Sequence, residues 1–445
     1  MYDSVYSDWF YMMPEELMIA KNLSEVMNLF APNEPLQGRA LTEFYVARPK
    51  GQIEPMRIFL EDHAEPVKIL FTGHRGSGKS TELNKLASLM GSKFLAVQFS
   101  VRRVLDPLNV TYTDLLLSMA VRLFREVTDQ RILNRRRRAL VGDGLLDDVY
   151  RWFTQEIILE KIVEPKADAG LSANVNLLFV KLEGKVSTEA VTRRTIRERI
   201  EHRVSELVAK MDRVVAEVQR NSGRRVLIIV EDIDKLDLEA AKTLFLRHAV
   251  SLNAPQAHII YTFPVALRND NDWTHIKNSF SNRFVLPNIR LRNFEGAPNA
   301  GGIAVMRDMV LNRMDASLIL SDALDLAVAM SGGLPFTLME LIQNAALSAR
   351  IQKKSVIDLE SVEEAVTEIR SDFQGMLEPA HYLTLRQYRQ TRWLENEEAV
   401  REVLHNLSLL EYANDRRWCD VHPIVVPLLD QEEASRQELK RLATP

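Results

Sequence analysis

A lysine and a serine follow closely spaced glycines in the segment FTGHRGSGKST, residues 71–81. Gly73, Gly78, Lys79 and Ser80 match the phosphate-loop pattern G-x-x-x-x-G-K-[ST]. In such a loop, backbone N–H groups and the positive end of the following helix point at phosphate oxygens. The lysine adds a positive charge for the outer phosphates, and the serine hydroxyl is the expected Mg²⁺ ligand. The predicted nucleotide-binding residues are therefore Gly73, His74, Arg75, Gly76, Ser77, Gly78, Lys79, Ser80 and Thr81.

The flanking residues predict the elements that must hold such a loop. Residues 67–72, VKILFT, alternate and cluster apolar side chains as a buried strand does, and Leu83, Leu86 and Leu89 recur at helical spacing. The alternative is a glycine-rich turn between a strand and a helix that binds nothing. The four fixed positions, with a strand before them and a helix after them, favour the phosphate loop.

A second, acidic site is expected, because phosphoryl transfer also needs carboxylates that hold Mg²⁺ and position water. Residues 226–230 are consecutive apolar residues, as in a strand buried on both faces, and Glu231 and Asp232 follow them. The carboxyl ends of parallel strands converge on ligands in α/β sheets. We predict that Glu231 and Asp232 bind Mg²⁺ together with Ser80. These two acids and Lys79 are the predicted catalytic residues, and the alternative is an acidic surface turn after a core strand.

The two motifs resemble those of the AAA+ and STAND branches of the P-loop ATPases. The likeness is strongest to initiator-type ATPases, whose pattern is four apolar residues followed by D-E-x-D-x-L. This resemblance implies ATP as the nucleotide and Mg²⁺ as its metal. It also puts Glu231 at the position of the magnesium-linked aspartate and Asp232 at that of the catalytic glutamate. The two acids are interchanged in length, and the shorter Asp232 side chain implies slow turnover.

Three further site residues follow only from the resemblance. Thr262 ends a segment similar to the sensor 1 strand, which contacts the terminal phosphate. Arg283 is where these families often keep an arginine that reaches a neighbouring subunit's nucleotide. Arg48 lies in a segment that resembles the adenine-side motif of such ATPases. The alternatives are a strand-ending threonine and, for Arg283, a solvated or ion-paired surface arginine.

Residues 331–351, SGGLPFTLMELIQNAALSARI, predict a glycine turn followed by a helix. In AAA+ lids a similar turn precedes the sensor 2 arginine, but this chain has Phe336 there. The GLP residues instead resemble the STAND switch motif, in which a proline, here Pro335, packs near the base and responds to the nucleotide state. The resemblance therefore implies nucleotide-dependent signalling rather than vigorous hydrolysis.

More than a hundred residues separate the predicted strand at residues 93–101 from the acidic strand, far more than a crossover needs. Apolar spacing predicts one long amphipathic helix over residues 189–219, and residues 172–186 favour a strand or hairpin. The RRRR run at residues 135–138 and the basic face of the long helix could contact nucleic acid. Because acids lie close to this run, oligomer or partner-protein contacts are favoured instead.

Residues 409–412 and 418–421 flank the turn ANDRR and predict a β-hairpin. With the helices before it, this hairpin resembles a winged helix, the appended module of initiator-type ATPases. The segment before the turn, residues 395–411, contains five glutamates and one arginine. Its charge would be repelled by DNA phosphates, so binding a protein or packing on the ATPase core is favoured over DNA reading.

The chain has 445 residues, a net charge of −4 and one cysteine, Cys419. This length favours two or three domains, and the single cysteine fits a reducing compartment rather than a disulfide framework. The first residues lack the basic and apolar regions of a signal peptide, and no apolar run approaches the length of a membrane helix. We expect a cytoplasmic protein that does not engage membranes.

The predicted fold class is α/β: a three-layer P-loop NTPase core with a parallel sheet, a helical lid and a small winged-helix-like module. We expect an N-terminal segment (1–43), a core (44–290, with an insert at 102–222), a lid (291–375) and a winged-helix-like module (376–445). The favoured function is an ATP-binding, slowly hydrolysing switch or scaffold that forms a homo-oligomer or binds a partner protein. Fold analogy adds a role in bacterial antiphage defence. The alternatives are an initiator-like DNA-binding ATPase and a nucleotide-binding scaffold without hydrolysis.

Overall fold

The computed structural model describes residues 19–133, 139–158, 171–393, 398–413 and 417–442. Its contacts divide the chain into two compact units. We call residues 52–72 and 86–285 the sheet unit. The described residues of 1–51, 73–85 and 286–445 are the lid unit. By its contacts, the phosphate loop therefore belongs with the lid unit.

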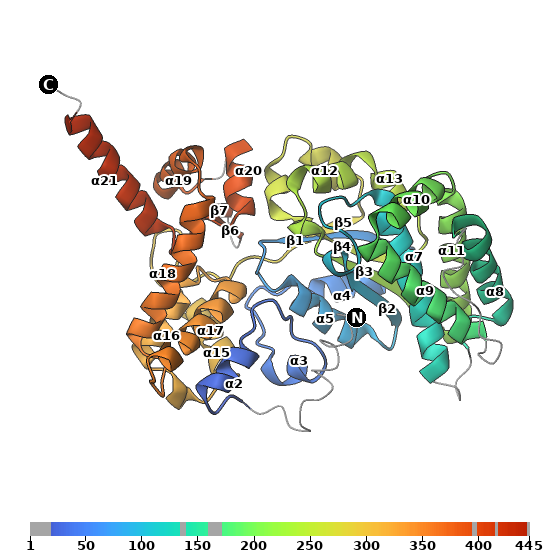
Figure 1. Ribbon diagram of the computed structural model, residues 1–445, viewed down its shortest axis with the longest axis horizontal. Coiled ribbons are helices and arrows are strands. Elements are labelled where there is room, and N and C mark those ends of the chain that lie inside the picture. Colours follow the sequence, from blue (N-terminus) through green and yellow to red (C-terminus); the bar gives the residue numbers. More distant parts are fainter. Residues whose placement is uncertain (1–18, 134–138, 159–170, 394–397, 414–416, 443–445) are drawn as a thin grey trace. The chain divides into compact units, whose positions relative to one another are not determined.

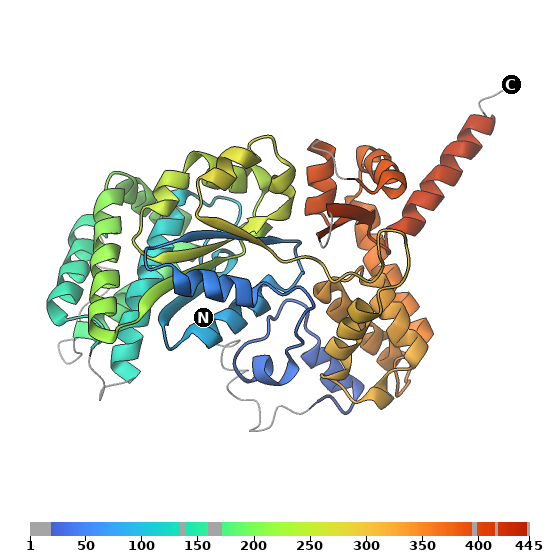
Figure 2. The same cartoon turned by 180° about the vertical axis from the view of Figure 1, so that it is seen from behind.

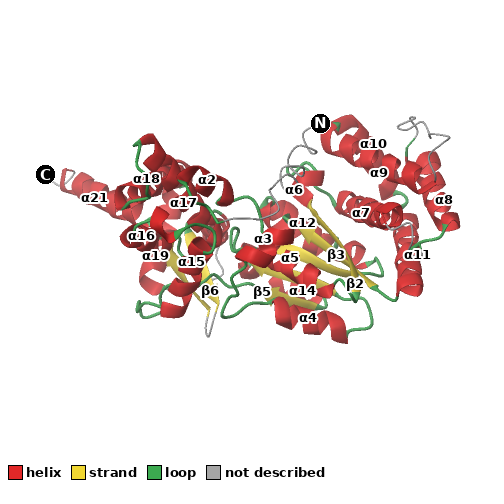
Figure 3. Cartoon of the chain, turned by 90° about the horizontal axis from the view of Figure 1, so that it is seen from below, coloured by secondary structure: helices red, strands yellow, loops and turns green. Residues whose placement is uncertain are grey.

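The sheet unit is built on a five-stranded parallel sheet with the order β2-β3-β4-β1-β5 in the described part of the chain. The strands are β1 (Lys68–Gly73), β2 (Phe94–Ser100), β3 (Arg225–Glu231), β4 (His258–Pro264) and β5 (Asn282–Val285). β1, β3 and β4 are buried along nearly their whole length, which explains their continuous apolar runs. Helices surround the strands (Figure 3). The predicted α/β fold class with a parallel P-loop core is confirmed.

The described residues of the insert between β2 and β3 form helices joined by loops, and they include no strand. Its helices are α6 (Val101–Val104), α7 (Tyr112–Leu133), α8 (Asp143–Trp152), α9 (Leu171–Thr188), α10 (Ala190–Glu201) and α11 (Val204–Ser222), with a π-helical turn at Phe153–Ile157. α7 and α11 pack directly on β2 and β3, and α8, α9 and α10 pack on these helices. Figures 1 and 2 show the group gathered at the β2 edge of the sheet.

Two predictions about this insert are wrong. Residues 172–186, predicted as a strand or hairpin, lie inside α9, because their apolar side chains recur every three to four residues on one buried face. The single helix predicted over residues 189–219 is instead the pair α10 and α11. The chain turns between them at His202 and Arg203.

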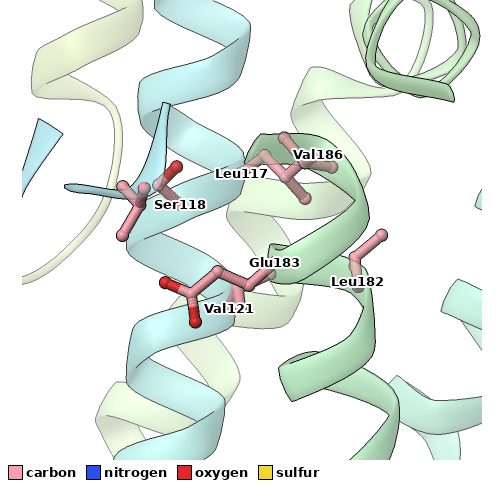
Figure 4. A pocket seen from close by; sticks show the side chains of 7 residues that line it. Leu117, Ser118, Val121, Leu182, Glu183 and Val186 are labelled. Atoms are coloured by element: carbon pink, nitrogen blue, oxygen red, sulfur yellow. The ribbon is translucent and has the colours of Figure 1, made fainter. Parts of the chain in front are cut away.

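A small hollow between α7 and α9 is lined mainly by apolar side chains (Figure 4). Its lining residues are Val104, Leu117, Ser118, Val121, Leu182, Glu183 and Val186. Glu183 forms ion pairs with Arg122 and Arg125, which neutralise its charge. The hollow is therefore a packing gap between helices and offers no unbalanced charge to a ligand.

The other helices of the sheet unit are short. They are α4 (Ile53–Asp62), α12 (Leu238–Arg247), α13 (Ala249–Asn253) and α14 (Trp273–Asn278). Helix α5 (Lys79–Met90) follows the phosphate loop, and its first residues group with the lid unit.

The lid unit combines a helical bundle with a β-hairpin. Its helices are α2 (Leu23–Leu29), α3 (Gly38–Phe44), α15 (Ala300–Leu311), α16 (Ser321–Met330), α17 (Pro335–Ile351), α18 (Leu359–Met376), α19 (Pro379–Thr391), α20 (Glu398–His405) and α21 (Val426–Leu442). α17 lies at the centre of the bundle and packs on α2, α15, α16 and α18. The predicted hairpin is present as β6 (Leu409–Ala413) paired antiparallel with β7 (Arg417–Val421).

Candidate functional site

The turn between β1 and α5 has a backbone that only glycines adopt without strain. Gly76 and Gly78 have φ values of +74° and +89°, in the left-handed region. Gly73 is needed for space, because a Cβ there would lie 2.6 Å from the carbonyl oxygen of Leu286. The glycine positions of the predicted phosphate loop are therefore dictated by its geometry.

Lys79, the first residue of α5, turns back over the loop. Its Nζ donates hydrogen bonds to the carbonyl oxygens of Gly73 (2.8 Å) and His74 (2.7 Å). The side chain is buried. The loop thus encloses an ammonium group, which is the charge that an anionic phosphate requires.

Two buried donors next to the loop lack a protein partner in the described structure. Ser77 is fully buried, and its Oγ has no hydrogen-bond partner there. Arg48 donates through Nη2 to the carbonyl oxygen of Ser77, but Nη1 of the same guanidinium is buried without a partner. Buried polar groups are rarely left unsatisfied, so both donors fit a site that receives an anion.

Arg48 is held at the loop by Glu82 and Tyr45, two residues that sequence reasoning missed. Arg48 Nε lies 3.6 Å from Glu82 Oε1, and Tyr45 donates its hydroxyl to the same oxygen at 3.1 Å. Burial lowers the pKa of Arg48 and raises that of Glu82, each opposed by the charge of the other residue. Burial and then the Glu82 charge raise the pKa of Tyr45. The sequence offered one signal for this contact, a glutamate in the first turn of the helix after the phosphate loop. It did not show that this glutamate pairs with Arg48, which lies in a distant segment.

The remaining predicted loop residues lie in the first turn of α5 or at the loop surface. Arg75 and Ser80 are half-buried. Thr81 accepts a hydrogen bond from the backbone N–H of Leu36 at 3.2 Å. The N-terminal segment is thereby attached to α5 beside the loop.

The start of α17 also contacts the phosphate loop. Pro335 is the first residue of α17, and Phe336 donates its backbone N–H to the carbonyl oxygen of Gly76 at 3.1 Å. A Cβ on Gly76 would lie 2.5 Å from the Cβ of Phe336. Phe336, which stands where the resemblance expects the sensor 2 arginine, therefore packs its phenyl side chain on the backbone of the loop.

His74 links the loop to the β-hairpin. Its Nε2 accepts a hydrogen bond from the backbone N–H of Glu411 in β6, at 2.7 Å. His74 and Glu411 are both buried, with exposed fractions of 2% and 3%. Their separation of 337 residues in sequence left no pattern from which this contact could be predicted.

The acids after β3 are bound by polar side chains of the sheet unit. Gln98 Nε2 donates to Glu231 Oε1 at 2.6 Å. Asp232 has φ +66°, a left-handed conformation that costs energy for a residue with a side chain. Its Oδ2 accepts from Ser100 Oγ, and its Oδ1 lies 2.7 Å from Lys235 Nζ.

Thr262 and Arg283 lie on other strands of the same sheet. Thr262 lies inside β4, which continues to Pro264, so it is not the strand-ending residue that the sequence suggested. β4 lies between β3 and β1, and the Thr262 hydroxyl accepts the backbone N–H of Ile233 at 3.2 Å. It is thus attached to the turn that carries the acids. Arg283 is exposed on β5, an edge strand.

Three of the four arginines of α10 form ion pairs, and the fourth, Arg199, donates to the carbonyl oxygen of Ile157 at 3.2 Å. Arg197 binds Asp114 at 2.7 Å, and Arg193 and Arg194 pair with acidic side chains at 3.3 and 3.0 Å. These charges are therefore largely neutralised within the protein. The other basic candidate, residues 135–138, lies outside the described residues.

Among the described helices, none is long and apolar enough to cross a membrane. Within the same part of the chain, no group of three or more His, Cys, Asp or Glu side chains is arranged to hold a metal ion. The predicted Mg²⁺ does not require such a group, since this ion takes ligands from substrate phosphates and water beside one or two carboxylates.

No protein-family model and no curated protein matches this chain. Similar solved structures include the Orc1 protein of Aeropyrum pernix in complex with DNA, at 13% identity and TM-score 0.41, with 92% of this chain and 98% of that chain covered. Cdc6p of Pyrobaculum aerophilum is 12% identical, with 93% and 100% covered and TM-score 0.41. A Walker-type ATPase of Pyrococcus abyssi is 13% identical, with 90% and 99% covered and TM-score 0.45. With identities and TM-scores this low, the function of this chain has to be inferred from its own residues.

Proposed function

We propose that the chain binds ATP with Mg²⁺ at the phosphate loop and acts as a nucleotide-dependent switch with slow hydrolysis. The observation that carries the proposal is the loop itself. A turn that requires glycine encloses the Lys79 ammonium, and the buried donors Ser77 Oγ and Arg48 Nη1 lie beside it. These groups would bind and orient the phosphates.

Ser80, Glu231 and Asp232 are the proposed Mg²⁺ ligands. The ion would neutralise charge on the phosphates. Ser80 follows directly on the phosphate loop, and the two acids follow directly on β3. β3 and β1 are parallel members of one sheet, and ligands of open α/β sheets bind beyond the carboxyl ends of the strands.

Slow hydrolysis follows from the state of Asp232, the proposed residue for orienting water. Both of its carboxylate oxygens have partners, Ser100 and Lys235. These two partners fix the orientation of the Asp232 carboxylate and compete with a water molecule for its lone pairs. The same observation favours a second candidate function, a scaffold that binds ATP without hydrolysing it.

Phosphate release from the full chain separates these two functions. With ATP and Mg²⁺, the switch predicts slow turnover that the Asp232→Asn variant abolishes. The scaffold predicts a rate that is negligible in both proteins. A fast wild-type rate would contradict both.

Binding itself is tested by calorimetry with ATP and Mg²⁺. Replacing Lys79 by Ala removes charge-assisted bonds, so affinity should fall about tenfold to a hundredfold. Lys181→Ala is the matched control, because Lys181 is an exposed lysine on α9. Equal affinity of both variants, or no heat with the wild-type chain, would end the proposal.

The proposed partner is a second copy of the chain or another protein. Arg283 is the proposed contact to a neighbouring subunit's nucleotide, and its exposure on the edge strand β5 supports this. Size-exclusion mass with and without ATP and Mg²⁺ tests assembly, and a mass that never changes would contradict it. A role in bacterial defence follows only from the family resemblance.

A further inference from the structure

His74 occupies a central position in the phosphate loop. Its carbonyl oxygen accepts from Lys79 Nζ at 2.7 Å and from the backbone N–H of Ser77 at 3.2 Å. The main chain of His74 therefore defines both the turn of the loop and the place of the ammonium group.

The side chain of the same residue leads to the hairpin. Nε2 accepts the Glu411 N–H at 2.7 Å, so this ring nitrogen carries no proton. The Glu411 carbonyl oxygen in turn accepts from Asn288 Nδ2 at 3.1 Å. Both backbone groups of Glu411 are thus bonded outside the hairpin. Asn288, His74 and Glu411 are all buried, which makes these bonds expensive to break.

A second contact fixes the hairpin to the turn before α17. Tyr412 donates its hydroxyl to the carbonyl oxygen of Gly332 at 2.8 Å. A Cβ on Gly332 would lie 2.5 Å from Leu410 Cδ1, so the hairpin packs closely on this turn. The hairpin therefore touches the lid turn and the phosphate loop through neighbouring residues of β6.

We propose that His74 is a positioning residue through which the β6–β7 hairpin supports the phosphate loop. Nucleotide affinity then depends on whether the hairpin is docked on the loop through the His74–Glu411 hydrogen bond. Linkage requires that bound nucleotide raise the equilibrium constant for this docking by the same factor by which docking raises nucleotide affinity. This inference rests on the proposed nucleotide binding and names the element that regulates it.

Two changes break the link from opposite ends. His74→Leu removes the acceptor, whereas His74→Gln can offer a side-chain oxygen in its place. Glu411→Pro removes the donor. Since Glu411 bonds to His74 and Asn288 and not across to Cys419, its opposite residue in β7, the proline removes no bond between the two strands. Glu411→Ala is the control for the side chain: it keeps the backbone N–H and removes the carboxylate together with its ion pair to Arg417 at 2.8 Å.

Affinity is measured in the full chain by titration with a fluorescent ATP analogue and Mg²⁺. His74→Leu and Glu411→Pro should bind about tenfold more weakly, because each leaves a buried polar group unsatisfied. His74→Gln should recover most of the affinity that His74→Leu loses, and Glu411→Ala should bind more tightly than Glu411→Pro. If Glu411→Pro does not fold, as judged by circular dichroism, the two His74 variants decide.

Amide hydrogen exchange distinguishes a positioning role of His74 from a purely structural one, because only the positioning role links exchange in the hairpin to bound nucleotide. Saturating nucleotide should slow amide exchange in residues 409–413 of the wild-type protein, and this effect should vanish in His74→Leu. The inference would be overturned if His74→Leu bound the nucleotide with wild-type affinity. It would also be overturned if nucleotide did not change the amide exchange rate of β6 in the wild-type protein. Absence of nucleotide binding by the wild-type chain would instead refute the proposed function.

Discussion

Arg48 and Glu82 form a buried ion pair beside the phosphate loop, with Arg48 Nε 3.6 Å from Glu82 Oε1. Their side chains are 6% and 1% exposed. Removing one partner of such a pair leaves the other charge in a medium of low polarity. Since Arg48 also donates to the Ser77 carbonyl, the order of the loop is tied to this pair.

The first prediction concerns the stability provided by the pair. Glu82→Ala leaves the Arg48 charge buried, and the free energy of unfolding should fall by about 3 kcal/mol. Chemical denaturation monitored by circular dichroism measures this. The control is Glu43→Ala, which breaks the more exposed pair with Arg39 on α3 and should change little. Equal losses in the two variants would show that Arg48 is not desolvated.

The second prediction concerns the geometry of the loop. Gly78→Ala places a Cβ 2.5 Å from Arg48 Nη2 at a φ of +89°. Either the backbone or Arg48 must move, so ATP affinity measured by calorimetry should drop at least about tenfold.

Gly184→Ala is the control for this change. Gly184 lies inside α9 with nothing near its added Cβ. This variant should bind ATP normally and gain up to about 1 kcal/mol in stability from the better helix propensity of alanine. Unchanged ATP affinity in Gly78→Ala would contradict the predicted crowding.

The third prediction concerns turnover. Lys235→Ala removes the cation that lies 2.7 Å from Asp232, leaving the carboxylate held by Ser100 alone. If Asp232 orients water, the rate of phosphate release should rise several-fold, and Lys235→Ala combined with Asp232→Asn should cancel the gain. Lys277→Ala on α14 serves as the charge-matched control. A Lys235→Ala rate equal to that of wild type would argue that the ion pair does not limit hydrolysis.

The fourth prediction concerns pH. Burial, with a smaller contribution from the neighbouring His74, lowers the pKa of His422 to about 3. Burial and then nearby cations lower that of His258 to about 4. Both stay neutral in the folded chain, whereas in the unfolded chain they bind a proton below about pH 6.5.

The folded state therefore loses stability as the pH falls from about 6.5 toward 4, by at most about 1.4 kcal/mol per pH unit for each histidine. Thermal unfolding midpoints at pH 7.5 and pH 5 measure the loss. In His422→Gln, whose side chain cannot be protonated, the midpoint should fall less between these two values. Parallel pH profiles of the two proteins would count against a buried neutral His422.

Sequence patterns predicted the helices, strands and turns that are determined by residues close together in the sequence. The glycine spacing, the apolar run before it and the leucines after it indicated β1, the loop and α5. The turn signal between residues 413 and 417 likewise indicated the hairpin, since two runs of strand-forming residues flank it. In these cases the residues that determine the structure are neighbours in the sequence.

Pairings between distant segments could not be predicted in this way. The contact of His74 with Glu411 and that of Arg48 with Glu82 depend on how the chain folds back on itself. The prediction for residues 172–186 failed for a different reason. The segment SANVNL at its start alternates polar and apolar residues, which is the period of a strand. The residues that follow bury apolar side chains every three to four positions, and this packing stabilises the helix α9 instead.

The grouping of residues 73–85 with the lid unit has a practical consequence for protein production. A fragment that ends at residue 285, after the last strand of the sheet, would still contain the two motifs found in the sequence. These are the glycine-rich loop and the acidic pair after β3. It would lack Leu286, Phe336 and Glu411, against which the glycine-rich segment packs. Trimming the gene at this point would therefore remove the residues that pack against the phosphate loop, and a fragment without ATP binding or phosphate release would not test the proposed function of the full chain.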